Sequence, residues 1–343
     1  MRFRKQDRVK SIANAARQFQ YAMEQSSTLD EAFQKLYTAA DQSQLETFRQ
    51  LESLLRRPQS EGAVAPTLRR SAYPMLAWLL RQTESPEKSA AALFREYGRH
   101  ESFSATTVVA VWNEFAGFLT YLGAVLAVLI VVVSMYAVLV LPQLQTLYSG
   151  FDLSLPPLTR VAFGRGSPLF LLLLVVAACL VVFLSWFVYL LRRRLRCFVP
   201  LSAGYQRIPL IGPVVIAYHQ YLWLSYASLL RVAGVPSAEA LRVAGTRVPL
   251  SQAWNWVARG AASEGTSMSG ASAVVSDLTM AARLGRLDDE TQFQQEATVD
   301  TFLGTLARCR RRSRIILTIC IYYLVATFVS AMYLPIFSLG STI

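Results

Sequence analysis

Residues 171–191 read LLLLVVAACLVVFLSWFVYLL, a run that contains no charged side chain. A helix of about 20 apolar residues is long enough to cross the hydrocarbon core of a bilayer. A helix buried in a soluble protein seldom stays apolar on every side over such a length. This stretch therefore predicts a transmembrane helix, which we place at Pro168 to Leu191.

Two further blocks have the same character, because no charged residue occurs from Phe115 to Phe151 or from Ile315 to Ile343. We place their spans at Phe118 to Leu141 and at Ile315 to Phe337. The whole chain is 53% hydrophobic and only 16% charged, which is typical of a protein partly embedded in lipid. Residues 1–10 are basic and polar, so no cleavable signal peptide is expected there. The fold class predicted is an all-α membrane protein with three transmembrane helices.

Arginines concentrate at two edges of these spans, and their position predicts the orientation of the chain. Basic residues next to a span favour the cytoplasmic side. We therefore expect residues 1–114 and 192–314 in the cytoplasm, and the loop 142–167 and the tail 338–343 outside. Attraction to anionic membrane lipids accounts for the basic clusters, so no nucleic-acid partner is expected. The clusters are Arg192, Arg193, Arg194 and Arg196, and Arg308, Arg310, Arg311, Arg312 and Arg314.

The two cytoplasmic segments share a helical pattern that indicates an internal duplication. Glu31-Ala32-Phe33 corresponds to Glu239-Ala240-Leu241, and each triplet comes early in an expected helix. Thr28 and Glu31 have the spacing of a capping box for the first of these helices. Leu141-Pro142 and Leu334-Pro335 close the first and third spans in the same way. We therefore expect two homologous helical-bundle domains, each followed by a span.

No residue pattern indicates an enzyme. The chain has no Gly-x-x-x-x-Gly-Lys-Ser/Thr run, so it has no nucleotide-binding P-loop. The two histidines, His100 and His219, lack a second ligand at metal spacing and are expected at a surface or interface. The cysteines lie in or beside the spans and imply no disulfide or zinc site. We predict no catalytic residues, no cofactor and no metal.

A few charged residues are candidates for contacts with a partner protein. The acidic cluster Asp288, Asp289 and Glu290 follows Arg283 and Arg286, and it suits either a docking surface or a solvated helix start. The repeated glutamates Glu31 and Glu239 complete the set of candidate contacts.

Three stretches resemble one family, the inner-membrane platform proteins of type II secretion systems (the secretion-F group) and type IV pili (the pilus-C group). The first contains Leu141-Pro142-Gln143, Leu147-Tyr148, Leu155-Pro156 and Thr159-Arg160. The second is Ile208-Pro209-Leu210-Ile211-Gly212-Pro213, followed by Ala233-Gly234-Val235-Pro236. The third is the C-terminal run from Met332 to Gly340, which contains Tyr333-Leu334-Pro335.

The resemblance implies a non-enzymatic platform in the bacterial inner membrane. Such a protein couples a hexameric assembly ATPase to the insertion of pilin or pseudopilin subunits into a filament. Other inner-membrane assembly components and further copies of the chain are expected partners. The chain departs from the family at Ala281 to Leu287, where relatives show Gly-Glu-x-Ser-Gly-x-Leu and the glutamate is absent here. The alternatives are a membrane anchor or receptor and a small transporter, although uncharged spans disfavour transport.

Overall fold

The computed structural model describes residues 18–56, 109–151, 154–163, 169–196, 198–251 and 273–340, with isolated positions at 15, 253 and between 75 and 100. Every regular element in these ranges is helical. The chain divides into two compact units. One comprises Met1–Ala110 with Leu191–Ala307, and the other comprises Val111–Leu190 with Arg308–Ile343.

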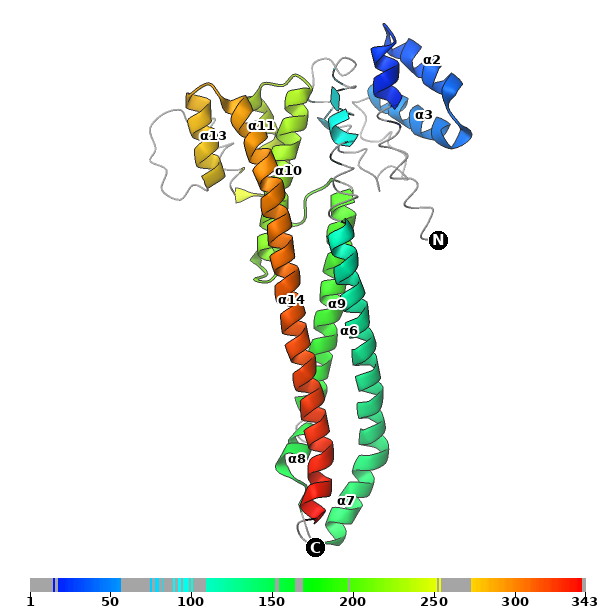
Figure 1. Cartoon of the computed structure of the whole chain (residues 1–343), viewed down its shortest axis with the longest axis vertical. Helices are drawn as coiled ribbons and strands as arrows, with labels where there is room; N and C mark the ends of the chain where they lie inside the picture. The colour runs from blue at the N-terminus through cyan, green and yellow to red at the C-terminus, as the bar shows by residue number, and fades with distance from the viewer. Residues whose placement is uncertain are drawn as a thin grey trace. The chain divides into compact units, whose positions relative to one another are not determined.

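The described helices follow one another along the chain in a fixed order (Figure 1). They are α2 (Leu29–Ala39), α3 (Gln42–Arg56), α6 (Val109–Met135), the π-helical turn η4 (Tyr136–Val140), α7 (Leu141–Gly150), α8 (Pro157–Phe163), α9 (Leu169–Arg196), the short 3₁₀ turn η5 (Ala203–Arg207), α10 (Gly212–Val232), α11 (Ser237–Arg247), α13 (Ala273–Arg283) and α14 (Leu287–Gly340).

Three helical segments are long and apolar enough to cross a membrane: Asn113–Gly150, Leu172–Leu195 and Leu287–Ser338. The expectation of three apolar spans in an all-α chain is confirmed to that extent. Neither Leu-Pro pair ends its helix, however. The helical path runs past Pro142 to Gly150, and α14 continues through Pro335 to Gly340.

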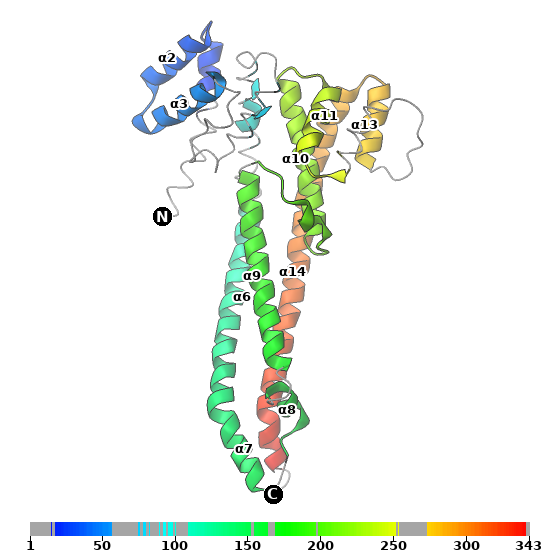
Figure 2. The ribbon, with the colours of Figure 1, turned by 180° about the vertical axis from the view of Figure 1, so that it is seen from behind.

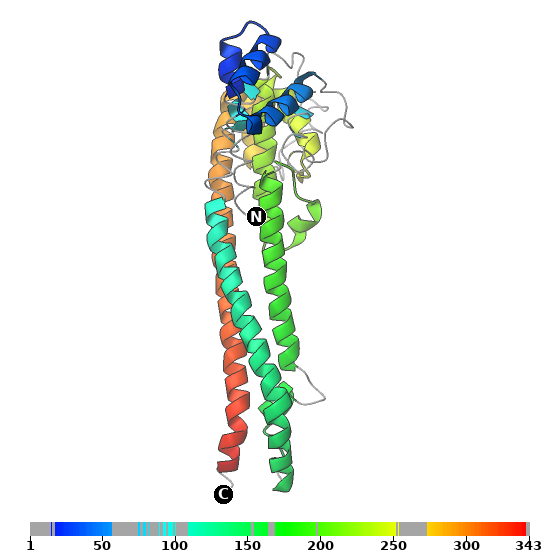
Figure 3. The same cartoon turned by 90° about the vertical axis from the view of Figure 1, so that its right-hand side faces the viewer.

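In the unit that holds the apolar helices, α6, α9 and α14 run side by side (Figures 1 and 2). Their buried residues recur at alternating spacings of four and three, the pattern by which one seam of a helix packs on its neighbours. In the side view α6 starts beside α14 and crosses toward α9 along its length (Figure 3). The seam of α6 is Phe115, Leu119, Leu122, Leu126, Leu129, Val133 and Tyr136; that of α9 includes Phe170, Leu174, Ala177, Val181, Leu184 and Val188.

Contacts at both ends show that α6–α7 and α14 run in the same direction. Near the start of α6, Glu114 forms a 2.6 Å ion pair with Arg310. At the other end, the Tyr148 hydroxyl of α7 donates a 2.7 Å hydrogen bond to the carbonyl oxygen of Pro335. Because α9 connects them, it must run antiparallel to both.

The other unit contains two helical corners, 208 residues apart in the chain, that share three backbone hydrogen bonds. In each corner a helix ends, four residues follow, and an 11-residue helix begins, α2 in one and α11 in the other. The matched amide donors are Gln25 and Ala233, Ser26 and Gly234, and Ala32 and Ala240.

The matched triplets occupy equivalent positions in these corners. Glu31 and Glu239 are each the third residue of their helix, while Ala32 and Ala240 are each the fourth and are both buried. Phe33 is 1% exposed and Leu241 is 0% exposed, so both point into a core. The sequence correspondence thus coincides with a correspondence in local structure.

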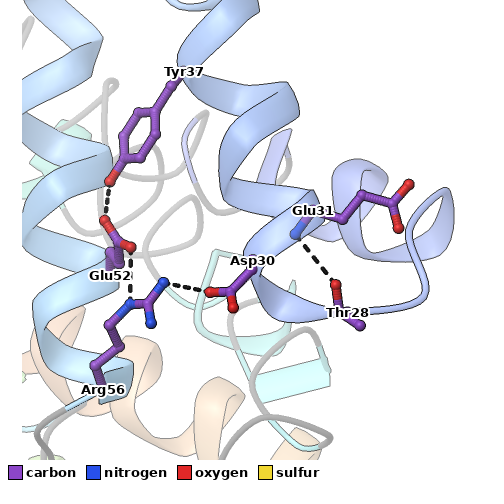
Figure 4. Close-up of polar contacts among 6 residues, drawn as sticks. All are labelled: Thr28, Asp30, Glu31, Tyr37, Glu52 and Arg56. Atoms are coloured by element: carbon purple, nitrogen blue, oxygen red, sulfur yellow. Dashed lines mark hydrogen bonds and ion pairs between the residues drawn. The ribbon is translucent and has the colours of Figure 1, made fainter.

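Polar contacts join α2 to the following helix, α3 (Figure 4). The Arg56 guanidinium bonds to Asp30 of α2 and, at 2.8 Å, to Glu52 of its own helix. Glu52 also accepts from the Tyr37 hydroxyl, and this contact together with burial raises the pKa of Tyr37. These contacts supplement the apolar face of Phe33 and its neighbours.

Half of the predicted capping box forms. The Thr28 hydroxyl accepts a 3.3 Å hydrogen bond from the Glu31 amide, which satisfies one free N–H at the start of α2. The Glu31 carboxylate accepts instead from the amide of Ser27, at 3.0 Å, one residue before the expected donor. The hydrogen bond from the Ser27 amide lowers the pKa of Glu31, and the hydrogen bond from Lys35 lowers it further.

Candidate functional site

A group of residues from α7, α8 and α14 meets at one end of the apolar helices. We call Tyr148, Thr159, Ala331, Pro335 and Ser338 the proline junction. Tyr148, Thr159 and Ala331 are each 3% exposed or less. Residues from two of the three stretches that carry the family resemblance are therefore in direct contact.

Pro335 creates the need for this junction. A proline inside a helix has no N–H, so the carbonyl four residues earlier, here that of Ala331, lacks its usual helical donor. The Thr159 hydroxyl donates to that carbonyl at 2.9 Å. A buried carbonyl without a partner would cost about 1–3 kcal/mol, so Thr159 offsets a cost that Pro335 introduces.

A second hydroxyl binds the next turn of α14. The Tyr148 hydroxyl donates to the Pro335 carbonyl at 2.7 Å and also contacts the Ser338 hydroxyl. The end of α14 is thus hydrogen-bonded to both α7 and α8.

The turn η4 determines which side of α7 faces the junction. The seam of α6 reaches Tyr136 and would continue at position 140, but the next buried residues are Leu141 and Tyr148. A π-helical turn contains one extra residue, and it moves the seam by one position. Without this shift Leu147, now 51% exposed, would point inward in place of Tyr148.

Aromatic rings from four elements pack just inside the junction. Phe328 of α14 lies 5.9 Å from Tyr136, 6.3 Å from Phe163 of α8 and 6.1 Å from Phe170 of α9, measured between ring centroids. Tilted and edge-to-face pairs at these distances are favourable beyond the area they bury. This cluster fixes the relative positions of the three apolar helices at that end.

The other resembling stretch forms a corner where η5 meets α10. The backbone of Gly212 approaches that of Gln206 so closely that a Cβ at position 212 would lie 2.3 Å from the Gln206 carbonyl oxygen. Gln206 donates to the Pro249 carbonyl at 2.6 Å, and its amide lies 2.9 Å from His219 Nδ1. Glycine at 212 is therefore a steric requirement of this corner.

His219 belongs to the core of this unit, so the expectation of a surface or interface histidine is wrong for it. The side chain is wholly buried, and its Nε2 accepts a 3.1 Å hydrogen bond from the Leu201 amide. That bond satisfies a buried N–H and requires a neutral ring. Burial lowers the pKa of His219 to about 4.

The predicted partner contacts divide into two kinds. The Asp288 carboxylate accepts from the Ser237 hydroxyl at the start of α11, and its backbone carbonyl accepts from Arg231 at 2.6 Å. Asp288 therefore connects α10, α11 and α14. Asp289 points outward and is paired only loosely with Arg286, at 4.0 Å, with both side chains about four-fifths exposed.

The remaining candidates are Arg283, Glu239 and Glu31. Arg283 is the exposed last residue of α13. Glu239 pairs with Arg242, which lowers its pKa, and Glu31 pairs with Lys35 at 3.0 Å. The structure thus brings Asp288 to the start of α11, the helix that carries Glu239, whereas Glu31 lies in the other corner of the unit.

Among the described residues, no group of three His, Cys, Asp or Glu side chains is placed to hold a metal ion. Comparison of the chain with protein-family models, curated proteins and solved structures finds no match.

Proposed function

We propose that this chain is the inner-membrane platform protein of a type IV pilus or type II secretion machine. In this role it couples a cytoplasmic hexameric ATPase to the insertion of pilin or pseudopilin subunits. The observation that carries the proposal is the proline junction. Tyr148, Thr159 and Pro335 come from two resembling stretches far apart in sequence, and hydrogen bonds connect them through one helix.

The repeated corners support the internal duplication that the sequence pattern predicts. Equal spacing and three matched backbone hydrogen bonds in the two corners are expected of two homologous cytoplasmic domains. The parallel direction of α6–α7 and α14 agrees with this, because each domain would be followed by a span that enters the membrane in the same sense. In this proposal the N-terminus is cytoplasmic and the C-terminus is periplasmic.

The orientation can be tested with reporter fusions. Alkaline phosphatase, which folds only outside the cytoplasm, is fused after Gly150 in one strain and after Val248 in another. We expect activity from the first fusion alone. Activity from the second alone would reverse the proposed topology.

The function is tested by mild-detergent purification of the tagged protein from its native cell, with mass spectrometry of the proteins that accompany it. Recovery of an assembly ATPase and a pilin-like subunit is the expected result. Recovery of a soluble regulator without either would instead favour a membrane anchor or receptor.

A further inference from the structure

Five arginines occupy seven successive positions of α14, from Arg308 to Arg314, and no charged residue follows them. In sequence they form one basic cluster. In the structure they divide between two sides of the helix.

Arg310 and Arg314 are directed toward α6. Arg310 pairs with Glu114 at 2.6 Å, and the Arg314 guanidinium lies 5.1 Å from the centre of the Phe118 ring. Both arginines thus stabilise contacts inside the protein.

Arg308, Arg311 and Arg312 lie on another side of α14 and are exposed. Spacings of three and four residues place them on the same helix face as Ile315 and Ile319. Ile315 is 49% exposed and Ile319 is 62% exposed. The exposed face continues through Tyr322 and Tyr323, while the buried seam of Leu317, Ile321 and Leu324 lies on the opposite side.

We propose that Arg311 and Arg312 bind the phosphate groups of anionic glycerophospholipids. A row of exposed apolar side chains with two guanidinium groups at its end matches a lipid molecule, whose chains are apolar and whose headgroup is anionic. The guanidinium group can bind phosphate oxygens through two hydrogen bonds, and its aliphatic stem lies along apolar surface. An aqueous anion would match the arginines but not the apolar row below them.

The test uses the purified full-length chain in mixed micelles with equal phosphatidylglycerol and phosphatidylcholine. Retained lipids are counted by native mass spectrometry. The wild-type protein should retain phosphatidylglycerol preferentially. In R311Q/R312Q the ratio of retained phosphatidylglycerol to phosphatidylcholine should fall about fivefold for each arginine replaced. R311K/R312K, which keeps both charges, should retain most of it.

The matched control is R310Q/R314Q, which removes the same charge from the side of the helix that faces α6. It should leave the lipid preference unchanged. Equal loss in both Gln variants would show an effect of net charge alone and overturn the proposal, as would an unchanged preference in R311Q/R312Q.

Wild-type protein labelled with a headgroup photoprobe of phosphatidylglycerol gives an answer that does not depend on any variant folding. Label within residues 308–316 is expected, and label found only elsewhere overturns the proposal.

Discussion

The Thr159 hydroxyl donates a hydrogen bond to the Ala331 carbonyl, one turn before Pro335 in α14. The bond replaces the helical N–H that proline cannot supply. α14 therefore keeps a proline within an otherwise regular helix because a neighbouring element provides the missing donor. The dependence between Thr159 and Pro335 can be measured as a coupling energy.

Thr159→Val removes the hydroxyl and keeps the shape of the side chain. We expect a loss of about 1–3 kcal/mol in the free energy of unfolding, because the Ala331 carbonyl becomes a buried acceptor without a donor. Thermal unfolding of the purified protein in detergent measures this loss.

Pro335→Ala is the control, since alanine restores an N–H that can donate to the same carbonyl. In the Pro335→Ala background, Thr159→Val should cost clearly less than in the wild type. A double-mutant cycle with no coupling between the two positions would contradict this account.

The three apolar helices were predictable because a charge-free run of this length has few other structures available. The proline junction was not predictable from periodicity. The sequence shows Leu-Pro twice and suggests two similar ends of spans. It does not show that Pro142 follows a π-helical turn while Pro335 is accommodated by Thr159, because that depends on which residues other helices bring nearby.

Deletion of Ala137 within η4 tests the role of the extra residue. The deletion should turn Tyr148 away from Pro335 by about one residue's rotation of the helix, about 100°. We expect a loss of stability larger than that of Tyr148→Phe, which removes the hydroxyl alone and leaves the seam of α7 in place. Equal losses, measured by thermal unfolding, would argue against the register shift.

Gly212→Ala tests the corner between η5 and α10. The added Cβ would lie 2.3 Å from the Gln206 carbonyl oxygen, so one backbone segment must move. We expect the free energy of unfolding to fall by about 1–3 kcal/mol, the usual range for overpacking. Gly304→Ala is a matched control, because no atom lies within 4 Å of its added Cβ and alanine favours a helix.

Glycine at position 285 also has a structural reason. Its φ of +69° ends α13 with the left-handed conformation that glycine adopts most readily. The sequence alone does not show this reason. The candidate partner contacts show another limit of the sequence. Asp288 and Asp289 are neighbouring aspartates in sequence, and only the fold shows that Asp288 makes internal contacts whereas Asp289 is exposed.

That separation sharpens the test of partner binding. The double reversal Arg286→Asp with Asp289→Arg keeps the net charge and changes two exposed side chains. We expect less ATPase in the purified complex and unchanged thermal stability. Asp288→Ala should instead cost about 1 kcal/mol of stability, because the Ser237 hydroxyl loses its acceptor. Unchanged recovery of the ATPase with the double reversal would remove Arg286 and Asp289 from the interface.

His219 predicts a pH dependence of stability. Burial holds its folded-state pKa at about 4, below the ordinary value of 6.5, so between these values the unfolded chain binds a proton that the folded chain does not. The stabilising effect of the neutral ring is complete above about pH 6.5 and is lost as the pH falls toward about 4, in total about 3 kcal/mol.

His219→Gln keeps a hydrogen-bond acceptor for the Leu201 amide and removes the titrating group. Between about pH 7 and about pH 5 the wild-type protein should lose about 2 kcal/mol more stability than this variant. His100, whose pKa is also lowered by burial, titrates in both proteins and cancels in the comparison. The measurement is thermal unfolding followed by tryptophan fluorescence at several pH values. Parallel curves for the two proteins would mean that the folded-state pKa of His219 is not lowered and would contradict this account.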